Sequence, residues 1–406
     1  MPGMLLRILP LPLLSASMAT LAEPPSKPAE PEVLDRILTT IEQEQSQHGT
    51  QSKDLIEPLT GLASLYQATG NHPLAAAVIE QALQIVRANY GLHSLEQVPL
   101  IRRSILTESA TGNVAGAWEH EQELLELASR HPEDLRIVPI LREIADGRMD
   151  LLGSYANGEF PPQIVLGCYY KPEPSVVDES GSCISGSRGH VIRSILLEAQ
   201  RMYLEAVATL VRHELYSSPE LRETELGTVR NTYLYRDYLA EAALYEFGRE
   251  RLQNLASYAE LRSALLDDRI SALIRIADWD LMFSRNGQAL EEYADVYGQL
   301  GETDGSSTSR DDIFSPTTPV VLPSFLPNPL ISEETGNSVG YIDVGFEITR
   351  FGIGRNVHIL DSSVNASDAA RNRLTRLIKG CRFRPIMTDG HFGRKSVVVL
   401  RYYIAA

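Results

Sequence analysis

Apolar side chains recur at helical spacing through most of the chain before residue 300. Val33, Ile37 and Ile41 lie four positions apart, with Leu34 and Leu38 beside them, which predicts a first helix. The stretch LTGLASLYQATGNHPLAAAVIEQAL, residues 59–83, shows the same spacing on both sides of a central ATGN. Gly70 interrupts the pattern there and predicts the turn between two antiparallel helices.

This hairpin resembles the tetratricopeptide repeat nearly position for position. The small side chains of Ala63 and Ala75 let the two helices approach closely, and Tyr66 fills the space beside them. Stacked hairpins of this kind form curved arrays whose hollow side is the usual docking surface for a partner protein. The positions that carry the resemblance are Leu59, Leu62, Ala63, Tyr66, Gly70, Ala75, Ile79 and Ala82.

Further copies of the hairpin are degenerate. ATGN at 68–71 recurs at 110–113, an offset of 42 residues, although Ser104 and Glu108 replace the leucine and tyrosine of the first copy. A third copy begins near Arg136 and loses its second helix to GEFPPQIVLG. We expect repeats over residues 33–157 and a second helical-repeat segment over 190–300, with a generic helical bundle as the alternative. The second segment has small or aromatic residues at the expected separations and two aromatics that should pack between helices: Ala277, Ala289 and Tyr293, then Trp279 and Tyr297.

Residues 340–406 follow a different pattern. GYIDVGFEI alternates apolar residues with polar or small ones, which predicts a half-buried strand whose inner face carries Ile342, Val344, Phe346 and Ile348. RFGIG predicts a turn, RNVHILDSS a second strand and SVVVLRYYI a third. Between the last two, Ser367 can cap a helix that Gly380 ends. The predicted fold class is therefore α+β and multidomain, an all-α helical-repeat body followed by a small β-β-α-β module.

This module resembles the C-terminal domain of the TonB family in the order and spacing of GYIDVGFEI, Gly354, NVHILDSS, Ala369–Ala370, CRFRP, Asp389–Gly390 and SVVVLRYY. The resemblance implies a domain that grips an extended segment of an outer-membrane transporter by adding it as a strand to a sheet edge. Cover by the linker, or by a second copy in a homodimer, is the alternative for that edge. The matching edge is the last strand, with Val397, Val398, Val399, Leu400, Arg401, Tyr402, Tyr403 and Ile404.

The first residues are typical of a secretory signal peptide. Arg7 gives a positive start, and residues 8–22 are apolar or small and too few to span a bilayer. We expect residues 1–22 to be removed, residues 23–32 to form a proline-rich tether, and the mature protein to reach the periplasm. An uncleaved N-terminus would instead give an inner-membrane-anchored, TonB-type energy transducer for outer-membrane transport.

Two further segments are irregular. Residues 158–189 are rich in Pro and Gly and contain Cys168 and Cys183, and in an oxidising compartment we expect a disulfide between them, worth about 3 kcal/mol. Cys381 is expected to be a small buried side chain. Residues 301–339 are rich in Ser, Thr, Pro and Gly, which predicts a linker between the body and the module.

Charge and motif content bear on function. The formal net charge is −16, yet residues 340–406 contain 11 Lys and Arg against 5 Asp and Glu. No nucleic-acid-binding motif accompanies this basic end, so solvated arginine on a small domain is the expected explanation. RHEL at 212–215 lacks the second histidine of a zinc-protease helix, and the sequence has no G-x-S-x-G or Walker loop. We predict a non-enzymatic adaptor without cofactor or metal, which binds protein partners such as an outer-membrane protein segment.

Overall fold

The computed structural model describes residues 31–157, 188–237, 241–261, 266–302, 309–314, 318–326, 328–331, 338–388, 390–393 and 395–405. The chain divides into two compact units, and the boundary between them lies at His213 and Glu214. The break that the sequence predicts at residues 158–189 is not the boundary of the units, because the described residues on both sides of 158–187 belong to the unit that ends at His213. None of the described helices is long and apolar enough to cross a membrane.

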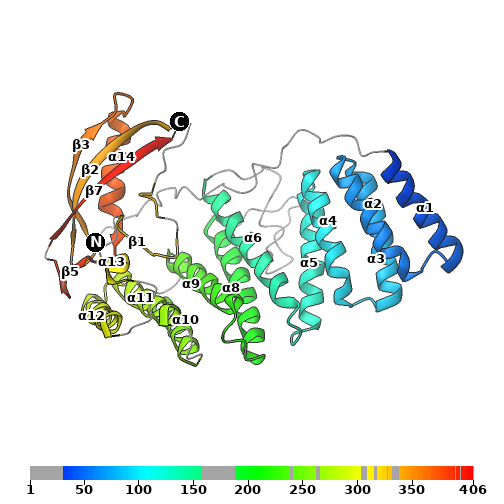
Figure 1. Ribbon diagram of the computed structural model, residues 1–406, viewed down its shortest axis with the longest axis horizontal. Coiled ribbons are helices and arrows are strands. Elements are labelled where there is room, and N and C mark those ends of the chain that lie inside the picture. The colour runs from blue at the N-terminus through cyan, green and yellow to red at the C-terminus, as the bar shows by residue number, and fades with distance from the viewer. Residues whose placement is uncertain are drawn as a thin grey trace, which may run out of the picture. The chain divides into compact units, whose positions relative to one another are not determined.

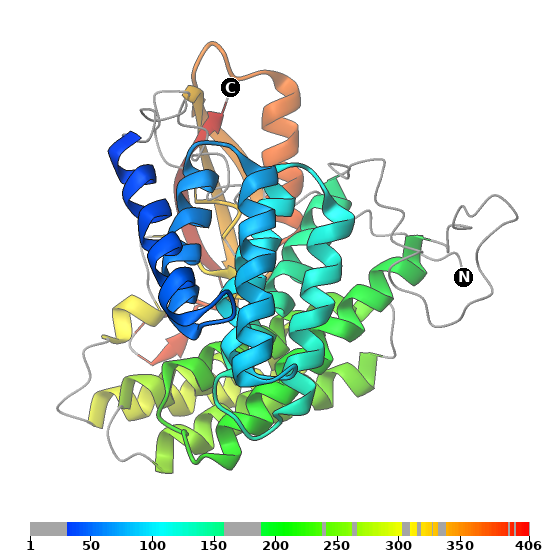
Figure 2. The same cartoon turned by 90° about the vertical axis from the view of Figure 1, so that its right-hand side faces the viewer.

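The unit that ends at His213 consists of helical hairpins. Each helix packs against the next along the chain, and the blue to cyan helices lie side by side in two perpendicular views (Figure 1 and Figure 2). The helices are α1 Pro31–His48, α2 Ile56–Ala68, α3 His72–Tyr90, α4 Val98–Ala110, α5 Val114–Arg130, α6 Ile137–Asn157 and α8 Arg188–Arg212.

The predicted offset of 42 residues is confirmed by the helix boundaries. Helices α2 and α4 begin at residues 56 and 98, and α3 and α5 begin at residues 72 and 114. Gly70 and Gly112 close the two hairpins with φ of +74° and +73°, a conformation that residues with a Cβ rarely adopt. The apolar positions of the first hairpin face its core, where the following residues are buried: Leu59, Leu62, Ala63, Ala75, Ile79 and Ala82.

Helices α6 and α8 form a third hairpin although residues 158–187 separate them in the sequence. The Tyr203 hydroxyl donates a hydrogen bond of 2.5 Å to Asp146 Oδ1, and Arg148 Nε lies 3.4 Å from Glu198 Oε2. Residues 158–167, where the third copy was predicted to lose its second helix, lie outside the described residues, and α8 is the described helix that packs against α6 at this place. Cys168, Cys183 and their predicted disulfide fall outside the described residues.

The second unit begins with four helices, α9 Pro219–Leu234, α10 Glu241–Leu261, α11 Leu266–Met282 and α12 Asn286–Glu302, and each packs against the next. Trp279 is buried, as predicted, and its ring packs against Tyr233 and Phe283 between the helices. Its indole N–H donates a hydrogen bond of 3.0 Å to the Tyr245 carbonyl. The expected core positions of the α11–α12 hairpin are fully buried: Ala277, Ala289 and Tyr293.

The C-terminal module of this unit is a three-stranded antiparallel sheet with one helix against it. Its long elements are β2 Ser338–Thr349, β3 Gly354–Ser362, α14 Asp368–Gly380 and β7 Lys395–Ala405, which confirms the predicted β-β-α-β order. The strands are arranged β3-β2-β7. The Ser367 hydroxyl caps α14 by accepting the Ala370 N–H at 3.2 Å. Leu374 and Ile378 of α14 share a core with Ile342, Val344, Phe346 and Ile348 of β2.

Part of the predicted linker is folded into the second unit. It contributes α13 Arg310–Phe314 and β1 Val321–Leu322, and β1 pairs with β4 Arg382–Phe383. A further short pair is formed by β5 Met387–Thr388 and β6 His391–Phe392. Phe314 and Leu330 are fully buried. The described parts of residues 301–339 are thus packed rather than a plain spacer, because the apolar residues between the prolines find partners far away in the sequence.

Candidate protein-interaction surface of the C-terminal module

Strand β7 is an edge of the sheet. It pairs with β2 from Ser338–Ala405 to Thr349–Lys395, and the register shifts only once, near Ser338. No described strand pairs with the other side of β7. Backbone N–H and C=O groups along such an edge are open to an added strand.

The predicted site residues alternate between the two faces of β7. The side chains of Val397 and Val399 on the outer face are 73% and 63% exposed. Val398 on the inner face is buried in the module core, where the partly buried side chains of Leu400, Tyr402 and Ile404 pack beside it. Apolar side chains therefore flank the free edge on both faces. The four outer-face residues lie opposite the outer face of β2, in the pairs Val397–Glu347, Val399–Gly345, Arg401–Asp343 and Tyr403–Tyr341.

Arg401 is neutralised on the outer face by its neighbour on β2. Its Nε and Nη2 donate to the two carboxylate oxygens of Asp343 at 2.8 and 2.7 Å. The hydrogen bonds from Arg401 lower the pKa of Asp343. The guanidinium also lies 4.2 Å from the centre of the Tyr341 ring. Because Arg401 is the one charged residue between Val397 and Ile404, this pairing leaves that stretch of the edge without net charge.

The opposite edge strand, β3, is less regular. Its pairing with β2 shifts register twice, once after Asp343 and once after Gly345. Asn356 adopts a φ of +51°, and the side chains of Arg355 and His358 are exposed. Bulges and charged side chains are the usual means by which proteins protect a sheet edge from pairing. Strand β7, which keeps one register with β2 from Gly340 to Thr349, is the more open of the two edges.

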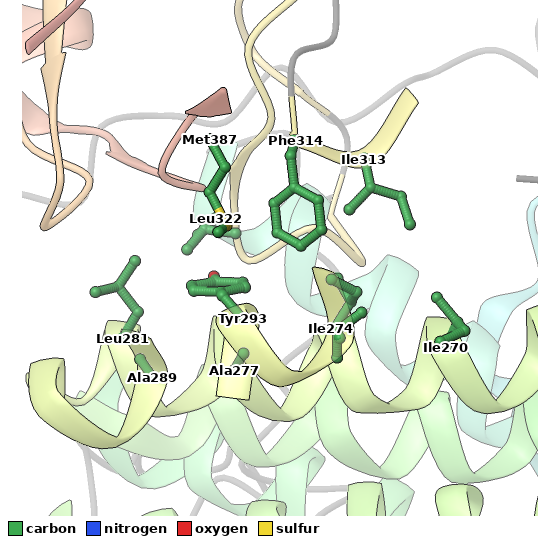
Figure 3. Close-up of a cluster of buried hydrophobic side chains, with 11 residues drawn as sticks. Ile270, Ile274, Ala277, Leu281, Ala289, Tyr293, Ile313, Phe314, Leu322 and Met387 are labelled. Carbon is green, nitrogen blue, oxygen red and sulfur yellow. The ribbon is translucent and has the colours of Figure 1, made fainter. Parts of the chain in front are cut away.

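The module shares a core with the last helical hairpin. A buried cluster joins Ile274 of α11 and Tyr293 of α12 to Phe314 of α13, Leu322 of β1 and Met387 of β5. Figure 3 shows Phe314, Leu322 and Met387 directed toward Tyr293 from the side opposite the helices. The position of the β7 edge is therefore fixed with respect to α11 and α12 by apolar packing.

A buried ion pair lies at the same junction. Nε and Nη2 of Arg384 donate to the Asp278 carboxylate at 3.0 and 2.7 Å, and the Tyr293 and Ser324 hydroxyls donate to it at 2.6 Å each. Only 4% of the Asp278 side chain and 11% of the Arg384 side chain are exposed. Burial, with the charge of Asp278, raises the pKa of Tyr293 well above its usual value. Loss of either partner would leave the other charge buried without its counter-charge.

The described residues offer little for metal binding or nucleophilic chemistry. Potential ligand atoms of Glu44, His48 and Asp54 lie within 4.8 Å of one another, but His48 Nδ1 is already hydrogen-bonded to Glu44 at 2.8 Å, and His48 and Asp54 are exposed. We interpret the group as a hydrogen-bonded pair on the surface with a nearby carboxylate. Burial raises the pKa of the Cys381 thiol to about 11, so this partly buried cysteine stays protonated near neutral pH.

No protein-family model matches the chain, and neither does any curated protein. Among solved structures, the chain is similar to a putative kinesin light chain with nearly identical TPR-like repeats from Podosopora anserina, at 15% identity and a TM-score of 0.36, over 63% of this chain and 99% of that one. It is also similar to BtubC (BKLC) from P. vanneervenii, at 11% identity and a TM-score of 0.35, over 75% of this chain and 97% of that one. Likeness at this level is too low to define the fold, so the repeat architecture rests on the recurring helix boundaries. The TonB resemblance stays a prediction.

Sequence reasoning missed the junction between helices and module. Asp278 and Asp280 flank Trp279 in α11, and all three side chains are buried. The sequence signal for this junction was a pair of aspartates on either side of a tryptophan in one predicted helix. Their partners could not be identified from the sequence pattern, because Arg384 lies 106 residues from Asp278 and Arg249 lies 31 residues from Asp280.

Proposed function

We propose that the protein is a periplasmic adaptor, in which the helical repeats hold one protein partner and the edge of β7 binds an extended segment of another by strand addition. Tandem helical hairpins support a role in protein binding in general terms. The open edge of β7 supports strand addition as the way in which the second partner binds. The predicted signal peptide supports export.

The observation that carries the proposal is the contrast between the two edges of the sheet. Strand β3 is interrupted by two register shifts, whereas β7 pairs with β2 in one register from Gly340 to Thr349 and has no described strand on its other side. Natural sheets seldom leave a regular, apolar edge open unless something pairs with it.

Strand addition at this edge calls for both backbone and side-chain contacts. Every second residue of an antiparallel strand directs its backbone groups to one side, so about half of the residues from Val397 to Ile404 can pair with a guest. A net gain of about 1 kcal/mol for each hydrogen bond gives only weak binding once the guest has been ordered. The exposed Val397 and Val399 side chains supply the additional apolar contact.

Site-specific photocrosslinking in cells that export the full chain tests the edge. A photoreactive residue at Val399 should capture a specific protein. The same residue at Leu360, which is 51% exposed on β3, is the matched control and should not capture it. Equal capture at both positions, or capture of only a second copy of this chain from Val399, would contradict strand addition of a partner.

Export is tested separately by sequencing the N-terminus of the mature protein. A chain that begins near Glu23 supports a periplasmic adaptor. A chain that retains residues 1–22 and sediments with the inner membrane would support the anchored, TonB-type transducer instead.

A further inference from the structure

A small cavity lies among the first three helices of the second unit. Its lining comes from α9, α10 and α11 and from Tyr216, which precedes α9. The cavity has a volume of about 20 Å³, which is room for one or two water-sized groups. Its apolar part is formed by buried Leu221, Leu255 and Ala272. The rings of Tyr216 and Tyr258 stand beside each other in the lining, with their centres 5.4 Å apart, and both side chains are partly exposed, so the cavity can be reached from solvent.

Arg275 of α11 lines this cavity without an ion-pair partner. Its Nη1 donates a hydrogen bond of 2.7 Å to Ser271 Oγ, and no carboxylate of the described residues lies within ion-pair distance of the guanidinium. The charges of Asp278 and Glu223 act on it only from farther away. Burial lowers the pKa of Arg275, the direction expected of a cation that has lost water without gaining a full counter-charge. A guanidinium has five N–H donors, so most of those of Arg275 remain for a ligand.

The other charges around the cavity are paired with one another. Asp278 accepts hydrogen bonds from Nε and Nη2 of Arg384 at 3.0 and 2.7 Å, and Glu223 Oε1 lies 3.7 Å from Nε of Arg222. Nη1 of Arg222 donates at 2.7 Å to Asp268, the acidic residue of the lining. Of the two cations that line the cavity, one is therefore neutralised by described residues and the other is not.

We propose that this cavity binds one carboxylate group through Arg275. The planar guanidinium presents pairs of N–H donors that match the two oxygens of a carboxylate. The size agrees, because those two oxygens need the room of about two water-sized groups. The carbon chain of the ligand lies along the rings of Tyr216 and Tyr258. The carboxylate belongs either to a short organic acid or to an acidic side chain of a protein segment, and the experiment separates these two sources.

Ligand-observed NMR on the full-length protein tests the site with propionate and propionamide, which have the same shape and differ in charge. At constant ionic strength, we expect saturable transfer of magnetisation from the protein to propionate. Binding of propionamide should be at least about tenfold weaker, because hydrogen bonds between charged groups are stronger than those of neutral ones. Equal binding of the two compounds, or no saturation by propionate up to about 50 mM, would overturn the proposal.

Matched variants locate the effect. Arg275→Met should abolish saturable binding of propionate. Arg269→Met is the control and should leave it unchanged, because Arg269 lies on the same helix, outside the cavity, and pairs with Glu260 at 3.1 Å. Arg275→Lys keeps the charge but loses the paired donors, so it should bind propionate several-fold more weakly, and it provides the result if Arg275→Met does not fold. Equal effects of Arg275→Met and Arg269→Met, or full affinity in Arg275→Lys, would contradict the assignment.

Urea unfolding gives a second measurement that a purely structural role of Arg275 would not change. Propionate should raise the unfolding midpoint of the parent protein, because a ligand stabilises the state that binds it. It should not raise the midpoint of Arg275→Met. An equal rise in both proteins would mean that propionate acts on the chain as a whole, and the proposed site would be wrong.

Two peptides distinguish the sources of the carboxylate. They are acetyl-Ala-Glu-Ala-amide and its glutamine counterpart, measured in the same way. Tighter binding of the glutamate peptide than of propionate, lost in Arg275→Met, assigns the site to an acidic segment of a protein, and binding no tighter than that of propionate assigns it to a short organic acid. Glutamate-peptide binding that survives in Arg275→Met would count against the site. Because none of these measurements involves β7, they stand apart from the crosslinking result at Val399.

Discussion

The junction between the helices and the C-terminal module can be tested by removing one charge of its buried ion pair. Arg384→Met keeps most of the side-chain volume but leaves Asp278 buried with only the hydroxyls of Tyr293 and Ser324 as donors. Breaking a buried pair by removing one partner costs about 3–5 kcal/mol. Because two hydroxyl donors remain, we expect a loss of free energy of unfolding near the lower end, about 3 kcal/mol.

The second unit contains its own control for this experiment. Arg401 and Asp343 form a bidentate ion pair like that of Arg384 and Asp278, and the shortest N–O distance is 2.7 Å in both pairs. The two pairs differ in exposure, because 50% of the Arg401 side chain is exposed, against 11% for Arg384. An exposed pair is screened by water and contributes little, so Arg401→Met should have a much smaller effect than Arg384→Met. The double variant Arg384→Met/Asp278→Asn removes both charges and should recover much of the loss.

Urea unfolding followed by tryptophan fluorescence measures these effects. The chain has two tryptophans, and a Trp118→Phe background leaves Trp279, which is buried in the second unit, as the reporter. If Arg384→Met costs no more than Arg401→Met, the buried pair does not hold the module to α11 and α12. If the double variant is no more stable than Arg384→Met, the loss does not come from an unpaired Asp278.

Three further predictions concern a closely packed glycine, a buried carboxyl group and the three cysteines. A Cβ at Gly248 would lie 2.1–2.7 Å from atoms of the buried Trp279 ring, so Gly248→Ala should lower the free energy of unfolding by about 1–3 kcal/mol, whereas Gly298→Ala, with no atom within 4 Å, should raise it by about 0.5–1 kcal/mol. Burial raises the pKa of Glu225 from 4.5 to about 7, so the folded state holds this proton more tightly and loses stability as the pH rises between those values. Glu225→Gln should therefore be more stable than the parent at pH 8 by about 3 kcal/mol and equally stable near pH 4, and urea titrations that show the same difference at both values would contradict this assignment. Thiol titration with a chromogenic disulfide at pH 8 should find no fast-reacting group in the native protein, one after unfolding and three after reduction, and two fast-reacting thiols before reduction would exclude the predicted disulfide.

The helical body could be predicted where its packing is local. In the first hairpin the apolar spacing marks the residues that pack against neighbouring helices, and Leu59, Ala63 and Ala75 are buried as expected. The second copy departs from this pattern because part of its contact with the first is polar. The Gln67 amide donates to the Thr107 hydroxyl at 2.8 Å, and Arg103 donates to the Gln67 amide oxygen at 3.1 Å. Such pairs have no apolar periodicity, so the repeat looked more degenerate than it is.

The candidate sites could be predicted only in part. The last strand was predicted as a strand, but residues 397–400 are all apolar, so only the structure shows that Val397 and Val399 lie on one face and Val398 on the other. The folded state of the linker depends on contacts between distant residues. Leu322 and Phe314 lie among prolines and serines, where composition favours a spacer, and their burial comes from α11, α12 and β5. The local sequence pattern does not show which distant residues come into contact.

Docking of the module changes how strand addition would work. A module on a flexible tether would have to be positioned each time a guest binds, and that ordering would oppose association. Here α13, β1 and the Asp278–Arg384 pair hold the module against α11 and α12. The β7 edge and the last helical hairpin then belong to one compact unit. A guest strand would therefore meet an edge whose position is already set by the helices, and its binding would not include the cost of ordering the module.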